Sequence, residues 1–224
     1  MRHGYLLSTL LLVAATAHAG VIINGTRLVY RGDKKESSLG ISNPDTTDYL
    51  VQSWVDADSK NHAAAPFLIT PPLFRLDAKE DNVLRVVRTG GNLPEDRESL
   101  YWLNIKAIPS SKHVEGVNTL QIAINTRIKL LYRPSSVKGK PEEMADKLEW
   151  HREGNDLVVN NPTPFYMNFQ SVVLNGHKIT KATWAVPETG THITLPANTG
   201  GDTVTYSIIT DYGSISKTWT KSVH

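Results

Sequence analysis

Residues Leu120 to Pro134 form a long stretch whose first half alternates strictly between apolar and polar-facing positions. Leu120, Ile122 and Ile124 fall on one face, here called the ridge, and the residues between them fall on the other. A period of two is typical of a β-strand with two unlike faces. Pro134 ends the stretch, because proline cannot donate to a strand ladder. The pattern predicts a long strand, which is either an ordinary core strand or one that offers its ridge to another protein.

The same period recurs in short runs through the first half of the chain. Asn43-Pro44-Asp45 is a turn signal, and Pro71-Pro72 favours a sharp bend or a cis peptide bond. No run shows the 3.6-residue period of a helix, so seven to nine short strands predict an immunoglobulin-like sandwich. The predicted strands are Thr26–Tyr30, Glu36–Ser42, Tyr49–Val55, Phe67–Thr70, Phe74–Leu76, Val83–Arg88, Ser99–Ile108 and Leu120–Tyr132.

A change of composition divides the chain after Pro134. Residues 135–145 are rich in Ser, Lys, Gly, Pro and Glu, which indicates a linker, with Pro141 at the start of one helical turn. Asn175-Gly176 predicts a hairpin turn in the β-rich part that follows. The strands predicted there are Leu148–Trp150, Asp156–Val159, Phe165–Leu174, Ala182–Val186, His192–Leu195, Thr203–Asp211 and Ser214–Val223. We therefore expect a first domain at 20–134, a linker at 135–146 and a second domain at 147–224.

The N-terminal residues have the pattern of a secretory signal peptide. Arg2 precedes an apolar run from Tyr5 to Ala15, and Ala17-His18-Ala19 is a small-residue cleavage site. The run is shorter than the ~20 apolar residues of a membrane span. We expect cleavage after Ala19 and an exported mature protein.

Charge and cysteine content exclude several classes of function. The chain has no cysteine, which removes disulfides, thiolate catalysis and cysteine zinc sites. Cleavage after Ala19 removes Arg2, so the formal charge falls from +2 to +1, with 23 basic against 22 acidic residues. A nucleic-acid-binding protein needs a clear basic excess. We therefore expect no nucleic-acid partner.

Catalytic and metal-binding motifs are also missing. There is no nucleophile elbow, glycine-rich phosphate loop or His-Glu-x-x-His motif. Asn24-Gly25-Thr26 matches a glycosylation acceptor, but this three-residue signal is common. We expect no enzyme, no metal, no cofactor and no small-molecule substrate. The histidines of the expected mature chain have no ligand spacing: His62, His113, His151, His177, His192 and His224.

The segment Leu93–Pro109 closely resembles the signature of periplasmic pilus chaperones, the PapD-like family. Other segments match in the same order, which extends the resemblance over nearly the whole mature length. Thr26–Tyr30 resembles the first strand of the family and Ile128–Pro134 the end of the last strand of its first domain. Asn161–Tyr166 and Asp211-Tyr212-Gly213 resemble motifs of its second domain.

The resemblance implies an all-β protein with two immunoglobulin-like domains set at an angle and a cleft between them. It implies that Leu120, Ile122 and Ile124 are lent to a pilus subunit that lacks its own last strand, which is donor-strand complementation. Arg27 and Lys129 match the two cleft cations that bind the C-terminal carboxylate of the subunit. The expected partners are pilus subunits and an outer-membrane usher, in the periplasm, and the free chaperone could also self-associate.

A further match concerns the joint between the domains. Glu98, Arg133 and Asp211 match an interdomain ionic network of the family. The short connection from Pro109 to Leu120 resembles the subgroup with short loops before the last strand. Some relatives carry a disulfide in the second domain, and this chain cannot form one.

Other interpretations of the same residues remain open at this point. An alternating Leu-Ile-Ile strand is usually part of a core, and Arg27 and Lys129 taken alone are ordinary surface cations. Ile128, Leu130 and Tyr132 share the parity of the ridge and are expected inside the first domain. A secreted immunoglobulin-like adhesin or pilin would also fit the β content. A polysaccharide-acting enzyme would need a carboxylate pair in a cleft, and the sequence nominates none.

Overall fold

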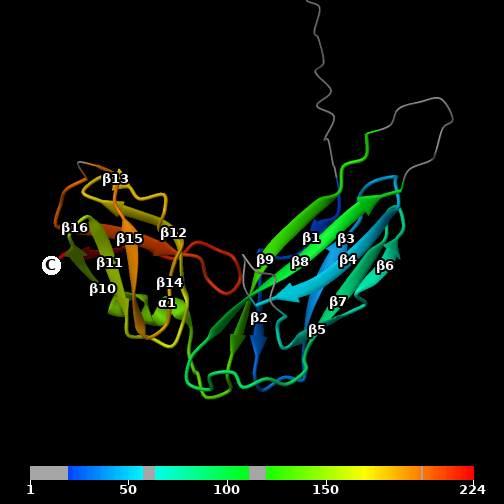
Figure 1. The fold of residues 1–224 in the computed structure, drawn as a ribbon, viewed down its shortest axis with the longest axis horizontal. Coiled ribbons are helices and arrows are strands. Elements are labelled where there is room, and N and C mark those ends of the chain that lie inside the picture. The colour runs from blue at the N-terminus through cyan, green and yellow to red at the C-terminus, as the bar shows by residue number, and fades with distance from the viewer. Residues whose placement is uncertain (1–19, 58–63, 111–119, 198) are drawn as a thin grey trace, which may run out of the picture.

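The computed structural model of the 224-residue chain describes residues 20–57, 64–110, 120–197 and 199–224. The expected signal peptide at residues 1–19 lies outside the described residues. Two lobes built of β-strands lie beside each other, with their strands running at an angle (Figure 1). The structure confirms the predicted fold class, two immunoglobulin-like β-sandwich domains set at an angle.

The first domain packs two β-sheets face to face. One sheet has the order β1-β3-β7-β5 and the other β2-β9-β8-β4-β6. The strand bounds are β1 Ile22–Ile23, β2 Arg27–Arg31, β3 Glu36–Ser42, β4 Tyr49–Asp56, β5 Phe67–Thr70, β6 Leu73–Leu76, β7 Asp81–Arg88, β8 Ser99–Pro109 and β9 Ile124–Arg133.

Alternate residues of these strands build the core between the two sheets. Leu39 and Ile41 of β3 face Leu103 and Ile105 of β8, and all four are almost fully buried. Burial of one such aliphatic side chain contributes roughly 1.5–3 kcal/mol. Three residues in the second half of β9 share this core, as the sequence predicts: Ile128, Leu130 and Tyr132.

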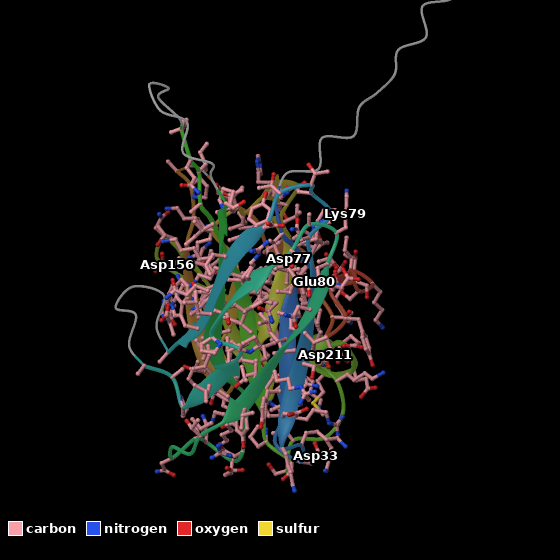
Figure 2. All side chains as sticks on the ribbon, turned by 90° about the vertical axis from the view of Figure 1, so that its right-hand side faces the viewer. Asp33, Asp77, Lys79, Glu80, Asp156 and Asp211 are labelled. Carbon is pink, nitrogen blue, oxygen red and sulfur yellow. The ribbon has the colours of Figure 1, made fainter. Side chains whose placement is uncertain are left out.

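Two turns of the first domain follow from local chemistry. The peptide bond between Thr70 and Pro71 is cis, as the proline pair predicts, and it lies between β5 and β6. At the turn between β6 and β7, Glu80 accepts a hydrogen bond from the Asp77 backbone N–H at 2.8 Å, and Lys79 has a φ of 64°. These three residues lie together at one end of the first domain (Figure 2).

The second domain is a smaller sandwich with sheets β10-β11-β15 and β13-β12-β16-β17, and β14 pairs with β12. Its core is rich in aromatic residues, with Trp150, Phe169 and Tyr206 in mutual contact. The bounds are α1 Pro141–Met144, a 3-10 turn Ala145–Lys147, β10 Glu149–Glu153, β11 Asp156–Asn161, β12 Met167–Leu174, β13 His177–Lys178, β14 Trp184–Ala185, β15 Thr189–Thr194, β16 Thr203–Ile208 and β17 Trp219–Ser222.

The main differences from the sequence predictions concern strand ends and two short strands. The strand predicted over Leu120–Tyr132 begins only at Ile124, whose register partner on β8 is Ala107. Residues 120–123 are therefore not assigned to a strand. β1 and β13 were not predicted, since two residues are too few to show a period. The helical turn expected at Pro141 is present as α1.

Candidate functional site

Arg27 and Lys129 are direct partners across the strand pair β2–β9. This pair is parallel, whereas β9 and β8 are antiparallel. Partner residues of neighbouring strands lie on the same face of the sheet. The structure therefore brings together the two cations that the sequence places 102 positions apart.

Both cations face the second domain. The Arg27 Nη1 donates a hydrogen bond to the Ile209 backbone oxygen at 3.2 Å, and the Lys129 ammonium donates to Asn168 Oδ1. The Arg27 Nε is buried and has no hydrogen-bond partner among the residues that the structure describes. Within the described ranges, no carboxylate lies within ion-pair distance of Arg27 or Lys129.

Burial affects the protonation of both groups. Burial, together with the charge of Arg27, lowers the pKa of Lys129 to about 8. Burial also lowers the pKa of Arg27, against the raising effect of Asp211 and Glu98. Two like charges held side by side and partly out of water are unfavourable without a counter-ion. This arrangement is chemically suited to an anion that both cations can contact.

The edge of β9 is open directly beyond this anchor pair, our term for Arg27 and Lys129. β2 pairs with β9 only from Arg27 to Arg31, opposite Lys129–Arg133. Over Ile124–Ile128, β9 pairs with β8 alone among the strands that the structure describes. An unpaired edge can accept a further strand through backbone hydrogen bonds. The anchor pair thus marks the position where the covered edge becomes uncovered.

The ridge side chains, at the start of this open edge and just before it in the chain, are exposed. Leu120 is 89% exposed, Ile122 65% and Ile124 49%, whereas Ile128 of the same parity is 8% exposed. The change from core to exposed surface lies between Ile124 and Ile128. The structure favours the interaction-surface interpretation of the ridge over the core interpretation, since an exposed apolar series is typical of a binding surface.

The predicted network of Glu98, Arg133 and Asp211 forms across the joint between the domains. Arg133 binds Asp211 through two hydrogen bonds of 2.7 Å and Glu98 through one of 2.7 Å. The other oxygen of Glu98 accepts from the Tyr166 N–H at 2.8 Å. Burial raises the pKa of the Glu98 carboxyl, against the lowering effect of Arg133. The orange-red loop after β16 extends toward β2 and β9 (Figure 1), and it carries Asp211, which is labelled in Figure 2.

The described ranges contain neither a metal-binding cluster nor a membrane-spanning helix. Within them, no group of three or more His, Asp or Glu side chains is arranged to hold a metal ion. In the same ranges, no helix has the length and apolar character needed to cross a membrane. His113 and His62 lie outside the described residues, and His151 and His192 lie near Glu153 on the second domain.

Comparison with protein families gives a match over both domains. The model described as "Pili and flagellar-assembly chaperone, PapD N-terminal domain" matches residues 20–138, and "Pili assembly chaperone PapD, C-terminal domain" matches residues 143–220. The chain belongs to the PapD-like family of pilus chaperones. The resemblance that the sequence motifs predicted is confirmed.

Relatives of this chaperone family are similar over nearly their whole length. The probable fimbrial chaperone LpfB of Escherichia coli O157:H7 is 44% identical, covering 96% of this chain and 94% of LpfB. The chaperone protein LpfB of Salmonella typhimurium LT2 is 45% identical with the same coverage. A chain in the structure of the Salmonella enterica SafA pilin in complex with the SafB chaperone has a TM-score of 0.85 and 40% identity, covering 93% of this chain and 98% of that chain.

Three residues at the anchor pair of this chaperone were missed by the sequence analysis. Trp102 is the register partner of Lys129 on β8, and Asn168 and Trp184 reach Lys129 from the second domain. Trp102 lies inside the Leu93–Pro109 signature, which gave a weak signal. Nothing in the sequence indicates that Asn168 and Trp184 approach Lys129.

Proposed function

We propose that this protein is a periplasmic chaperone that holds pilus subunits by donor-strand complementation and delivers them to an outer-membrane usher. The names of its relatives and the pilin complex of SafB support this role. The observation that carries the proposal is the anchor pair, two cations with no carboxylate partner among the described residues, next to an open strand edge whose ridge is exposed.

The proposed anchoring would fix the direction of an incoming strand. If a subunit places its C-terminal carboxylate between Arg27 and Lys129, its preceding residues lie along the open edge toward Ile124. Because β9 runs from Ile124 to Arg133, such a strand runs parallel to β9 and continues the line of β2. This is the same pairing that β2 already makes with β9.

Anchoring one end of this strand determines its register. Lys129 is five residues from Ile124, about 17 Å at ~3.3 Å per residue. A slip by one residue would turn the subunit side chains away from the ridge. The carboxylate anchor therefore decides which apolar side chain of the subunit meets which side chain of the ridge.

The two parts of the surface contribute differently to binding. Burying the three ridge side chains contributes roughly 5–9 kcal/mol at ~1.5–3 kcal/mol each. Charge-assisted hydrogen bonds to the carboxylate contribute ~1.5–3 kcal/mol each. Removing one cation leaves a desolvated carboxylate half-paired, which costs ~3–5 kcal/mol at a buried site. Affinity comes mainly from the ridge, and register comes from the anchor pair.

Co-expression with the pilin subunits encoded in the same genome tests the proposal. The tagged chaperone is purified from the periplasm, and the bound subunit is identified by mass spectrometry. We expect a stable one-to-one complex with at least one subunit and none with the folded variant Lys129→Ala. Failure of every such pilin to co-purify with the wild-type protein would refute the chaperone role.

The same experiment separates the alternative, a secreted adhesin or pilin-type structural protein. Such a protein would be incorporated into pili rather than stay in the periplasm. We expect this chain in the periplasmic fraction and not in purified pili. Its similarity to chaperones over both domains favours the chaperone role.

A further inference from the structure

Two tryptophans from different domains meet beside Lys129. Trp102 on β8 is the register partner of Lys129, so their side chains lie on the same face of the sheet. Trp184 belongs to β14 of the second domain. The ring centroids of Trp102 and Trp184 are 6.2 Å apart at an interplanar angle of 63°, an edge-to-face contact. This contact joins the two domains next to the anchor pair.

Each indole also carries a cation on its face. The Lys129 Nζ lies 4.3 Å from the ring centroid of Trp184, and the Arg127 guanidinium carbon lies 4.6 Å from that of Trp102. Both distances are within the ~6 Å over which a ring face attracts a cation. The four side chains therefore form a continuous row in which two rings lie between two cations.

The second domain holds Lys129 with two neighbouring side chains. Trp184 and Asn168 are cross-strand partners of β14 and β12. Asn168 Oδ1 accepts a hydrogen bond from the Lys129 ammonium, and the Asn168 side-chain amide donates to the Tyr166 backbone oxygen at 3.3 Å. A free lysine side chain samples many rotamers. Here its ammonium is directed by one hydrogen bond and one ring face.

We propose that Trp184 is a positioning residue of the anchor pair, which holds the Lys129 ammonium beside Arg27 before a subunit arrives. The proposal deepens the proposed function and rests on it. A cation that is already directed and only partly hydrated needs little reordering when a carboxylate binds, and preorganisation of this kind raises affinity. Trp184 belongs to neither the ridge nor the anchor pair. Through Trp184, the second domain nevertheless becomes part of the carboxylate site.

The charged groups around Lys129 determine how its pKa should respond to a change at Trp184. Arg27 on β2 faces it, Arg127 lies two residues earlier on β9, and β12 and β14 contribute the uncharged Asn168 and Trp184. Glu98 and Asp211, the carboxylates whose charges act on Arg27, are paired with Arg133. Burial is the main cause of the lowered pKa of Lys129. Removing the indole should admit water and raise that pKa by more than the loss of the ring-face attraction lowers it.

The first test needs no subunit. The pKa of Lys129 is measured by NMR titration of the free chaperone with labelled lysine side chains, and Lys129→Arg assigns the signal. We expect a value about one or more pH units higher in Trp184→Ala, and near the wild-type value in Trp184→Phe, which keeps a ring face. Trp54→Phe is the matched control, because Trp54 lies on the same sheet face and its indole N–H donates to Asp56. An unchanged pKa in a folded Trp184→Ala would overturn the proposal.

The second test measures carboxylate recognition. The probe is a synthetic alternating peptide, acetyl-Thr-Val-Thr-Val-Thr-Val-Gly, with either a free carboxylate or a C-terminal amide. In Trp184→Ala, the preference for the free acid at pH 7 should fall about tenfold, and Trp184→Phe should restore most of it. An undiminished preference in Trp184→Ala overturns the positioning role. A wild-type protein that does not prefer the acid instead refutes the anchor pair, and the NMR titration still decides the role of Trp184.

Discussion

Arg27 of β2 and Lys129 of β9 occupy partner positions on two parallel strands, and both donate to the second domain rather than to a carboxylate. β2 begins at Arg27. Among the described strands, β2 therefore covers the edge of β9 from Lys129 to Arg133 and leaves it open from Ile124 to Ile128. One pair of residues therefore combines an anion site with the start of a strand-accepting edge.

Loss of either cation should abolish subunit capture without unfolding the chaperone. In Arg27→Ala or Lys129→Ala, the subunit carboxylate would be buried with half of its partners, at a cost of ~3–5 kcal/mol. Pull-down of the co-expressed subunit and circular dichroism of the free variant check the two parts. Wild-type yields of subunit with either folded variant would contradict the role of the anchor pair.

Replacing Lys129 by an apolar residue should stabilise the free chaperone. The pKa of Lys129 is about 8 in the folded protein against 10.5 for an ordinary lysine. The unfolded chain binds more protons between these values, so the free energy of unfolding rises with pH across this window. Below pH 8 the charged lysine penalises the folded state by up to ~3 kcal/mol. Lys129→Met should therefore be more stable than wild type at pH 7, with a smaller difference at pH 9.5.

Urea unfolding at the two pH values measures this difference. Lys106→Met is the matched control. Lys106 lies on β8, on the sheet face that also carries Lys129, and it is not part of the anchor pair. Its effect should stay within ~0.5 kcal/mol at both pH values. A Lys129→Met variant less stable than wild type at pH 7 would show that the ammonium stabilises the free protein.

A charge on the ridge should weaken binding and leave the fold intact. Ile122 is 65% exposed, so Ile122→Asp removes an apolar contact to the subunit worth ~1.5–3 kcal/mol without disturbing a core. Leu130 has the same parity and is fully buried, and Leu130→Asp should unfold the first domain. Circular dichroism and subunit pull-down distinguish the two variants. A loss of native structure in Ile122→Asp would place that residue in the core of the chaperone.

The interdomain network should contribute to stability through its buried members. Arg133→Met leaves the fully buried Glu98 carboxylate without its cation, at a cost of ~3–5 kcal/mol. Adding Glu98→Gln should recover part of this loss, because the remaining group is uncharged. Urea unfolding of the single and double variants measures the coupling. Equal stability of Arg133→Met and wild type would exclude an energetic role for the network.

Local patterns were sufficient to predict most strands. Glu36–Ser42 and Phe67–Thr70 are observed at the predicted bounds, because their alternation reflects one buried face. Residues 120–123 show the limit of this signal. A period of two predicts which side chains share a face, whereas a strand also needs backbone pairing with a neighbouring strand, and the pairing of β9 with β8 begins only at Ile124, opposite Ala107.

Contacts between distant segments could not be predicted from local patterns. The register of Arg27 against Lys129 was reached only through resemblance to a family, since nothing near either residue indicates the other. The approach of Asn168 and Trp184 to Lys129 depends on how the two domains meet. That contact is a property of the assembled fold, and neither residue lies in a segment with a distinctive pattern.

Amide hydrogen exchange over Ile124–Ile128, compared between the free protein and its complex with a captured pilin subunit, tests the central claim most directly. The open edge leaves those backbone amides of this segment that point away from β8 without strand partners among the described residues of the free protein. We predict that exchange there slows strongly in the complex and that the protected segment ends at Lys129, where β2 already covers the edge. Unchanged exchange over Ile124–Ile128 in a verified one-to-one complex would contradict strand donation by β9.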